Sequence, residues 1–257
     1  MDNLAAIARQ NLSETYMGLG ECSEGGIAHR NEGFWYCESP VDLAFCNFAL
    51  HLDLDRYESG CAGAMTRLRE LSRFRSSFRV FAATGDSPSD VREVLSISGF
   101  RRQHGLVTLG ANPTGVAPNE GLVLLEATDL DSRIDITKFM ANQFFSRNSG
   151  RLRHHVVEST SRSSHHLFGV ELNGQLVAGV MLTGMESAVG LYNLCVLPNL
   201  RRKGLGSQIV LKVSEIAFGM GIPVVLQCEP SLEGWYQRLG FRRIGTVEAF
   251  SFTPSLF

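Results

Sequence analysis

The most informative stretch of the sequence is Leu191-Tyr192-Asn193-Leu194-Cys195-Val196-Leu197-Pro198-Asn199-Leu200-Arg201-Arg202-Lys203-Gly204-Leu205-Gly206. Its first seven residues are nearly all apolar or aromatic, which predicts a strand covered on both faces, and the Pro-Asn pair ends that strand. From Leu205 the apolar residues recur at helical spacing, which predicts a helix that Gly219 or Gly221 ends. A strand, a glycine-containing turn and a helix therefore follow one another directly.

The turn between this strand and this helix has the composition of an anion site. The start of a helix leaves backbone N–H groups unpaired and carries partial positive charge. Gly204 and Gly206 let the main chain approach an anion closely, and three cationic residues precede them. The alternative for the hexapeptide Arg201–Gly206 is a basic turn that is simply exposed to solvent. The spacing is neither that of a Walker loop nor that of the dinucleotide fingerprint, so we predict a different polyphosphate ligand.

A second motif, Leu232-Glu233-Gly234-Trp235-Tyr236-Gln237-Arg238-Leu239-Gly240-Phe241, follows a predicted strand at Pro223 to Cys228. The order of a strand, an Arg-x-x-Gly-x-Gly turn, a long helix, a strand and Tyr-x-x-x-Gly-Phe resembles the GNAT superfamily of N-acetyltransferases. The resemblance covers roughly residues 122 to 257, and the two motifs together are far more specific than either alone.

The resemblance implies that acetyl-coenzyme A is the co-substrate and assigns residues to it. The loop would hold its pyrophosphate, and the edge of the preceding strand would pair with its pantetheine arm. The residues implied are Arg201, Arg202, Lys203, Gly204, Leu205, Gly206 and Ser207 for the loop, and Leu194, Cys195 and Val196 for the strand edge. Tyr236 would protonate the leaving thiolate, which a phenol can do; packing under its helix is the alternative.

No residue is singled out as the general base. Glu186 lies before the apolar strand and Glu229 directly follows Cys228, so both are candidates, and an ordered water chain is the third possibility. Cys195 is interpreted as a small core residue rather than a nucleophile, because no histidine lies near it in the sequence.

These assignments predict an enzyme that transfers an acetyl group directly from acetyl-coenzyme A to a primary amine of a small molecule or peptide. The alternative is a non-catalytic module that binds acyl-coenzyme A and reports it. Three arginines in the predicted loop of residues 146–155 suit a carboxylate-bearing acceptor or, equally, a solvated surface. Neither the acceptor nor the length of the acyl chain follows from the sequence.

Composition sets the wider expectations. The chain of 257 residues is 44% hydrophobic and 19% charged, with a net charge of -2, so we expect no nucleic-acid partner and no membrane association. The N-terminal segment has no signal-peptide pattern, which predicts a cytoplasmic protein, either a monomer or a homodimer. The six cysteines form no Cys-x-x-Cys pair and the histidines no His-x-x-x-His pair, so we predict no metal.

A repeat divides the chain. Gly99-Phe100-Arg101-Arg102 and Gly240-Phe241-Arg242-Arg243 are identical and lie 141 positions apart (240 minus 99). The same offset sets Gly60-Cys61-Ala62 on the three cations, Met65 on Gly206 and Leu95 on Tyr236. We therefore predict that the first half is a copy that has lost the anion site and serves structure or substrate binding, although a chance match of four residues is the alternative.

The expected architecture is an α/β (α+β) fold with a mixed, mostly antiparallel sheet flanked by helices, GNAT-like, in two tandem copies. We predict an N-terminal domain of residues 1–112, a linker rich in glycine, proline and asparagine at 113–121, and a catalytic domain of residues 122–257. In the second domain we expect a strand at 122–126, a helix near 135–145 and a hairpin turning at Asn173-Gly174.

Overall fold

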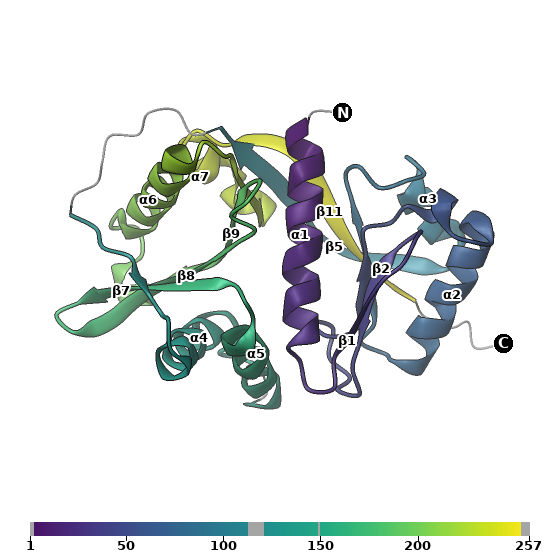
Figure 1. The fold of residues 1–257 in the computed structure, drawn as a ribbon, viewed down its shortest axis with the longest axis horizontal. Coiled ribbons are helices and arrows are strands. Elements are labelled where there is room, and N and C mark those ends of the chain that lie inside the picture. The colour runs from purple at the N-terminus through teal and green to yellow at the C-terminus, as the bar shows by residue number, and fades with distance from the viewer. Residues whose placement is uncertain (1–2, 113–120, 149, 253–257) are drawn as a thin grey trace. The chain divides into compact units, whose positions relative to one another are not determined.

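The computed structural model describes residues 3–112, 121–148 and 150–252, drawn in Figure 1. The chain forms two compact units, each described by itself below. The first contains the chain up to Thr108, the short segment Gln227–Pro230 and everything from Ile244 onwards; the second contains Leu109–Leu226 and Ser231–Arg243. The predicted division into residues 1–112 and 122–257 treats each half as continuous, whereas these units are interleaved in sequence. Most of the predicted linker, residues 113–120, lies outside the described residues.

The first unit is built on the strand order β1-β2-β3-β4-β11-β5. The last strand of the chain, β11, pairs antiparallel with β4, which brings it into this unit. The elements are α1 (Asn3–Glu21), β1 (Ile27–Arg30), β2 (Trp35–Glu38), β3 (Phe48–Leu50), the 3-10 helix η1 (Leu54–Arg56), α2 (Gly60–Phe74), β4 (Arg79–Ala83), α3 (Val91–Ile97), β5 (Phe100–Ala111) and β11 (Arg242–Phe252).

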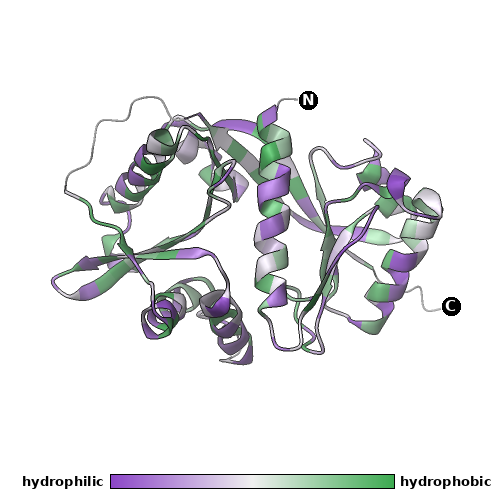
Figure 2. Ribbon diagram, in the orientation of Figure 1, coloured by the Kyte–Doolittle hydropathy of each residue, from purple (hydrophilic) through white to green (hydrophobic). Residues whose placement is uncertain are grey.

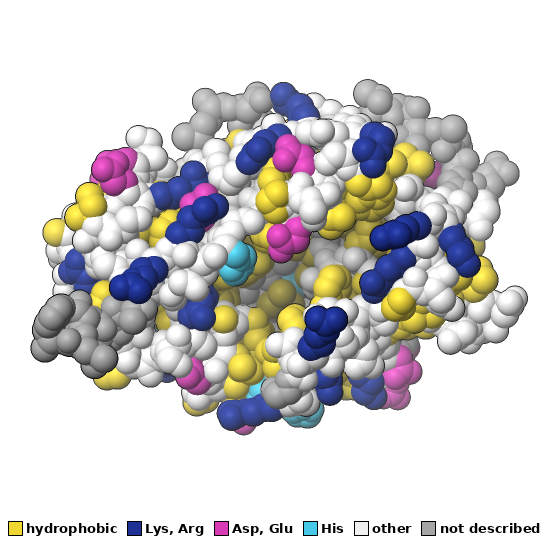
Figure 3. Space-filling model, turned by 180° about the vertical axis from the view of Figure 1, so that it is seen from behind, with side chains coloured by type: hydrophobic (Ala, Val, Ile, Leu, Met, Phe, Trp, Pro, Cys, Tyr) yellow, Lys and Arg dark blue, Asp and Glu magenta, His cyan; other side chains and the backbone are white. Residues whose placement is uncertain are grey.

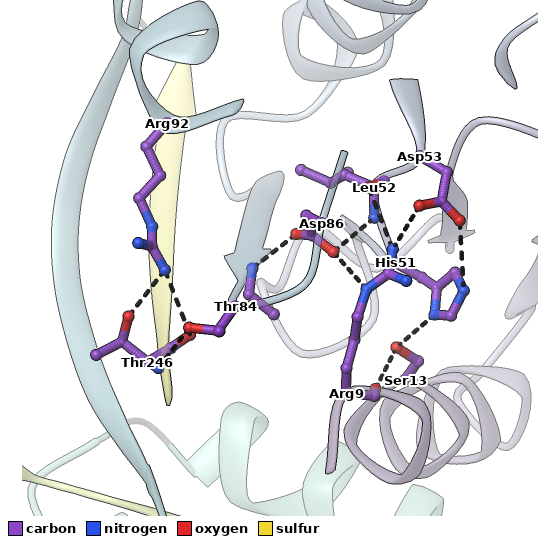
Figure 4. Close-up of polar contacts among 10 residues, drawn as sticks. Arg9, Ser13, His51, Leu52, Asp53, Thr84, Asp86, Arg92 and Thr246 are labelled. Atoms are coloured by element: carbon purple, nitrogen blue, oxygen red, sulfur yellow. Dashed lines mark hydrogen bonds and ion pairs between the residues drawn. The ribbon is translucent and has the colours of Figure 1, made fainter. Parts of the chain in front are cut away.

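Helix α1 is fixed in the first unit by an ion-pair network (Figure 4). Nε of Arg9 lies 2.6 Å from Oδ1 of Asp86, and Nη2 of Arg9 lies 3.1 Å from Oδ1 of Asp53. The Asp86 carboxylate also accepts hydrogen bonds from the main-chain N–H groups of Leu52 and Ala83. A buried charge is tolerated only when it is paired and hydrogen-bonded, so these contacts explain how an aspartate occupies this interior position.

The second unit is built on the strand order β10-β9-β8-β7-β6. Its elements are β6 (Leu125–Glu126), α4 (Leu130–Phe144), α5 (Gly150–Arg162), β7 (His166–Leu172), β8 (Gln175–Thr183), β9 (Val189–Val196), the 3-10 helix η2 (Pro198–Leu200), α6 (Leu205–Met220), β10 (Val224–Cys228), the 3-10 helix η3 (Pro230–Leu232) and α7 (Glu233–Gln237). Helix α6 ends where Gly221 adopts a left-handed conformation, one of the two predicted stops.

Both units confirm the predicted mixed sheet with helices on its faces. In the second unit β6, β7, β8 and β9 pair antiparallel and β9 and β10 pair parallel. Figure 1 shows α4 and α5 on one side of β7 and β8 and α6 on the other. Figure 2 shows these strands with long hydrophobic stretches and α5 mainly hydrophilic, as expected for a sheet buried between helix layers.

The hairpin predicted at Asn173-Gly174 joins β7 to β8. Both residues have positive φ, 52° and 75°, which a two-residue turn of type I′ requires at its two central positions. The paired residues Leu172 and Gln175 flank the turn directly. Because turn length sets the pairing register, this dipeptide fixes which β7 and β8 side chains face the core.

The two units repeat one connection. In the first, β2 and β3 are antiparallel and β3 pairs parallel with β4 after a crossover through α2; in the second, β8, β9 and β10 are related in the same way through α6. When the offset of 141 positions is applied, the residues of α3 also align with those of α7. However, α2 begins at Gly60, so the residues aligned with the basic loop form the first helical turn. Leu95, aligned with Tyr236, is fully buried in the core.

Among the described helices, none combines the length and the hydropathy needed to cross a bilayer.

Candidate functional site

The second unit contains a cavity of about 580 Å³ at the end of β9. Its walls come from four places: the end of α4, the last residues of β9, the loop that opens α6, and the segment around α7. The lining residues are Gln143, Phe144, Leu194, Cys195, Val196, Arg201, Arg202, Gly204, Gly206, Ser207, Leu232, Trp235 and Tyr236. The two sequence motifs, about thirty residues apart in the chain, therefore line one space.

One wall of the cavity is an open strand edge. The parallel pairing of β9 with β10 covers Val189 and Gly190, and it does not extend along β9 into the part that lines the cavity. The N–H of Leu197 donates to the carbonyl of Val177 in β8 at 2.9 Å. Because successive residues of a strand direct their main-chain groups to opposite edges, those of Val196 and Leu194 face away from β8. Leu194 and Val196 can thus bond an extended ligand.

A bulge interrupts β9 just before this edge. Cys195 pairs with Gly179 and Tyr192 pairs with Met181, so Asn193 and Leu194 together face a single residue of β8. Asn193 has a φ of 53°, a conformation that asparagine adopts more readily than most residues. A bulge frees main-chain groups from the ladder and redirects the strand. The apolar run predicted a regular strand here, and the lone asparagine within it was the available signal for the bulge.

The loop before α6 presents unpaired amides to the cavity. The first main-chain bond of the helix runs from the N–H of Gln208 to the carbonyl of Gly204 at 3.0 Å, so the N–H groups of the preceding three residues point out of the helix start. Gly204 has a φ of 87°, and a β-carbon added to it would meet no heavy atom within 4 Å, so its surface is open to a ligand. Arg202 also has positive φ, at 62°, so the loop backbone curves tightly at two places.

Arg201 closes the junction between β9 and the loop. Its Nε donates to the carbonyl of Val196 at 2.9 Å, and its Nη2 donates to Oε1 of Gln143 on α4 at 3.2 Å. The guanidinium thus fixes the end of the strand to the loop and to α4. One of the three predicted loop cations is accordingly engaged with protein atoms.

Tyr236 lies in the wall formed by α7. The residue is 6% exposed, and its ring packs edge-on against Phe241, with centroids 5.6 Å apart and planes at 70°. Trp235 packs beside it with centroids 4.4 Å apart. The phenol therefore lines the cavity from a constrained position, so the packing role and the proton-donor role predicted for Tyr236 are compatible.

Cys195 lines the cavity but is 6% exposed. Burial raises the pKa of its thiol to about 12, so the group is protonated at neutral pH. A thiol acts as a nucleophile through its thiolate, and this environment suppresses it. The interpretation of Cys195 as a core residue agrees with this chemistry.

Some predicted residues lie elsewhere. Lys203 and Leu205 belong to the loop but are not among the residues that line the cavity. Glu186 is exposed in the turn before β9. At the usual rise per residue, Leu194 lies roughly 16 Å beyond the first residue of that strand. Glu229 is exposed directly after β10 and is grouped with the first unit. The structure thus brings Tyr236, the loop and the strand edge together, without a glutamate among the lining residues.

Four lining residues were not predicted: Gln143, Phe144, Leu232 and Trp235. Helix α4 begins at Leu130, earlier than the predicted start near 135, because the Asp129 side chain caps it by accepting from the N–H of Ser132 at 3.0 Å. The sequence Asp129-Leu130-Asp131-Ser132 carried this signal. Phe144 and Leu232 are 48% and 44% exposed, so the cavity also has an apolar side.

The loop predicted at 146–155 is shorter than expected. Helix α5 begins at Gly150, so two of the three arginines of the predicted loop, Arg151 and Arg153, are helical. Arg153 Nη1 donates to the carbonyls of Phe145 and Asn148 at 3.1 and 2.9 Å, which closes the turn between α4 and α5. This side chain is therefore structural. Elsewhere, Figure 3 shows the lysines and arginines of one face spread out singly or in small groups.

Residues 135–241 match the family described as Acetyltransferase (GNAT) family. No curated protein sequence matches the chain.

Solved structures share the fold over most of the chain. A GCN5-related N-acetyltransferase from Kribbella flavida is 14% identical, with a TM-score of 0.67 over 99% of this chain and 97% of its own. A GNAT-family acetyltransferase from Novosphingobium aromaticivorans is 14% identical, with a TM-score of 0.57 over 98% of each chain. A tandem GNAT protein from the clavulanic acid biosynthesis pathway is 13% identical, with a TM-score of 0.59 over 84% of this chain and 81% of its own.

At this identity the structures establish the fold, which is GNAT-like and agrees with two copies in tandem. Together with the family match, they confirm the resemblance seen in the sequence motifs. The segment that matches the GNAT acetyltransferase family, residues 135–241, includes the α6 loop and Tyr236.

Proposed function

We propose that the protein is an acetyl-coenzyme A-dependent N-acetyltransferase that transfers the acetyl group directly to a primary amine. One observation carries the proposal: the open edge of β9, the unpaired amides at the start of α6 and the Tyr236 ring line a single cavity. An extended ligand with a diphosphate at one end and a thioester at the other matches this sequence of groups. Acetyl-coenzyme A has that composition and supplies the activated acetyl group.

The residues of the cavity fit such a ligand. The amides of Leu205, Gly206 and Ser207 would bind the pyrophosphate at the positive end of α6, with Arg202 and Lys203 adding charge. Leu194 and Val196 would pair with the amides of the pantetheine arm, in the manner of an added strand. Cys195, whose main chain is engaged with Gly179 of β8, would contact the arm by packing.

Transfer then needs three things from the protein. Binding holds the thioester and the acceptor together, so that the neutral amine can attack the carbonyl carbon. After the bulge, the main-chain N–H of Leu194, which lines the cavity, would donate to the carbonyl oxygen as its charge grows, while the Leu194 carbonyl stays free for the pantetheine arm. As the new C–N bond forms and the C–S bond breaks, Tyr236 gives its proton to the departing thiolate and regains one from solvent.

The amine must also lose a proton. Glu229 and Glu186 are the candidate bases, each acting through water, and a water chain without a dedicated base is the remaining route. Glu186 lies at the opposite end of β9 from the cavity, which disfavours it as the base. The acceptor is a small-molecule amine or a peptide amine, and a cytoplasmic monomer or homodimer remains our prediction for the protein in the cell.

The test is calorimetric titration of the whole chain with acetyl-coenzyme A, followed by release of free coenzyme A thiol in the presence of a panel of primary amines. Binding with amine-dependent thiol release supports the proposal. Binding without release for any amine would favour the alternative, a non-catalytic module that senses acyl-coenzyme A. Absence of binding would overturn both.

A further inference from the structure

Trp235 connects the two sequence motifs physically. Its Nε1 donates a hydrogen bond to Oγ of Ser207 at 3.1 Å. A β-carbon on Gly206 would lie 3.6 and 3.7 Å from Cζ2 and Cη2 of the indole, so the ring lies over the first turn of α6. The contact crosses 28 residues of sequence and joins α7 to the helix start that carries the unpaired amides.

The bond occupies an acceptor site of the Ser207 hydroxyl and leaves its donor site unused. A hydroxyl has one donor and two acceptor sites, and here the indole uses an acceptor site. A serine within a helix often donates to the carbonyl four residues earlier, as Ser214 does to Val210 at 3.0 Å. Within the described part of the chain, the hydrogen bond of the Ser207 hydroxyl is the one from Trp235. Its O–H therefore remains available to a ligand.

The position of Ser207 defines that ligand. The residue is the third of α6 and lines the cavity with Gly204, Gly206 and Trp235. Its main-chain N–H precedes the first bonded amide of the helix, so N–H and O–H donors lie at one place. Donors grouped at a helix start bind a phosphate oxygen, and a hydrogen bond to a charged acceptor is stronger than one to a neutral acceptor.

We propose that Trp235 is a positioning residue for the pyrophosphate of the co-substrate and acts through Ser207. The indole N–H holds the hydroxyl so that its proton points into the cavity, while the ring fixes α7, which carries Tyr236, against the phosphate loop. The proposal rests on the function proposed above and adds to it a residue that touches the anion only through another side chain.

A double-mutant cycle separates this role from simple packing. Ser207→Ala removes the donor to phosphate and should raise the Kd for coenzyme A about 10-fold, the size expected of one charge-assisted hydrogen bond. Trp235→Phe keeps an aromatic ring, removes the indole N–H and should raise the Kd about 3-fold to 5-fold, part of the same effect. If Trp235 acts through Ser207, adding Trp235→Phe to Ser207→Ala should change the Kd by less than about 2-fold.

Inorganic pyrophosphate is the second probe, titrated by calorimetry against the same variants, and it should reproduce the cycle because the interaction concerns the anion alone. Trp35→Phe, in β2 of the first unit, is the matched control and should leave both Kd values unchanged. Additive effects of the two substitutions, or a Trp235→Phe variant with wild-type affinity for both probes, would overturn the proposal.

A fluorescence measurement covers the case in which Trp235→Phe does not fold. The chain has two tryptophans, so the Trp35→Phe variant reports on Trp235 alone. Saturation with pyrophosphate should change its emission, and Ser207→Ala in that background should shift the titration midpoint by the same factor as the calorimetric Kd. Unchanged emission on saturation would overturn the coupling. If the wild type binds neither probe, the proposed function itself fails, which is a different outcome from binding with additive effects.

Discussion

Arg201 donates a hydrogen bond from Nε to the carbonyl of Val196 at 2.9 Å, across the turn that joins β9 to the loop before α6. Val196 lies at the end of the strand edge proposed to pair with the pantetheine arm. The same guanidinium reaches Gln143 on α4. A planar side chain with several fixed donors suits this role, because it can hold three segments at once.

Arg201→Gln tests that role. Loss of the two bonds should loosen the loop and raise the Kd for coenzyme A about 3-fold to 10-fold, since each hydrogen bond of this kind contributes roughly 1 kcal/mol or somewhat more. Calorimetry measures the Kd. Arg151→Gln, an exposed residue of α5, is the control for the change in charge. Equal affinities for wild type and Arg201→Gln would show that the loop holds its shape without the guanidinium.

Gly204→Asp should abolish coenzyme binding. The position has room for a β-carbon but a φ of 87°, so part of the effect is backbone strain. Gly204→Asn carries a similar strain without the charge, because both residues tolerate this conformation. We expect the asparagine variant to bind weakly and the aspartate variant not to bind within the range of calorimetry. Two variants with the same affinity would mean that no anion lies at this loop.

Tyr236→Phe should lower kcat by about 100-fold or more, the usual effect of losing a proton donor, and leave the Kd for acetyl-coenzyme A within about 2-fold. The substitution keeps the ring that packs against Phe241, so the fold should persist. The measurement is steady-state thiol release, with the Kd determined separately. Normal turnover by the phenylalanine variant would restrict Tyr236 to packing.

The two candidate bases give different expectations. Glu186→Gln should keep kcat within about 2-fold of wild type, since the residue lies in the turn before β9, at the opposite end of that strand from the cavity. Glu229→Gln should lower kcat/KM if this carboxylate accepts the amine proton, and steady-state thiol release measures the change. Unaltered kinetics in both variants would leave the water chain as the route.

The stability of the first unit should depend on pH through His51. Burial, and then the neighbouring Arg9, lower the pKa of this imidazole from 6.5 to about 4. The folded state therefore binds fewer protons than the unfolded state between these values, and the contribution of His51 to stability is lost as the pH falls from about 6.5 towards 4. Above about pH 6.5 the contribution of His51 to the free energy of unfolding is fully present.

His51→Asn isolates this effect, because asparagine accepts the φ of 54° at the position. Urea unfolding at several pH values should show a shallower loss of stability below pH 6.5 for the variant. Burial raises the pKa of Asp86 to about 6, which acts in the opposite direction over part of this range, but it is common to both proteins and cancels in the comparison. Parallel curves would contradict the assignment to His51.

Residues close together in the chain were enough to predict the local elements and an anion site at the start of α6. The apolar run before Pro198 and the helical period after Leu205 fixed a strand and a helix, and Asn173-Gly174 fixed a hairpin, because each depends on neighbours in the chain. Two glycines beside cations at a helix start indicated a phosphate for the same reason. The repeat of Gly-Phe-Arg-Arg pointed to two copies before any contact was visible.

Which distant groups share a cavity depends on the tertiary structure. Phe144, Leu232 and Trp235 join the loop there because α4 and α7 pack around the end of β9, and no local pattern encodes that packing. The pairing of β11 with β4 likewise depends on contacts between residues far apart in the chain, such as Thr84 and Thr246, which are 162 positions apart. Helix spacing and turn geometry are properties of short segments, so the sequence can predict them. The position of Glu186 away from the cavity and the hydrogen bond from Trp235 to Ser207 depend on the packing of segments that are distant in the chain.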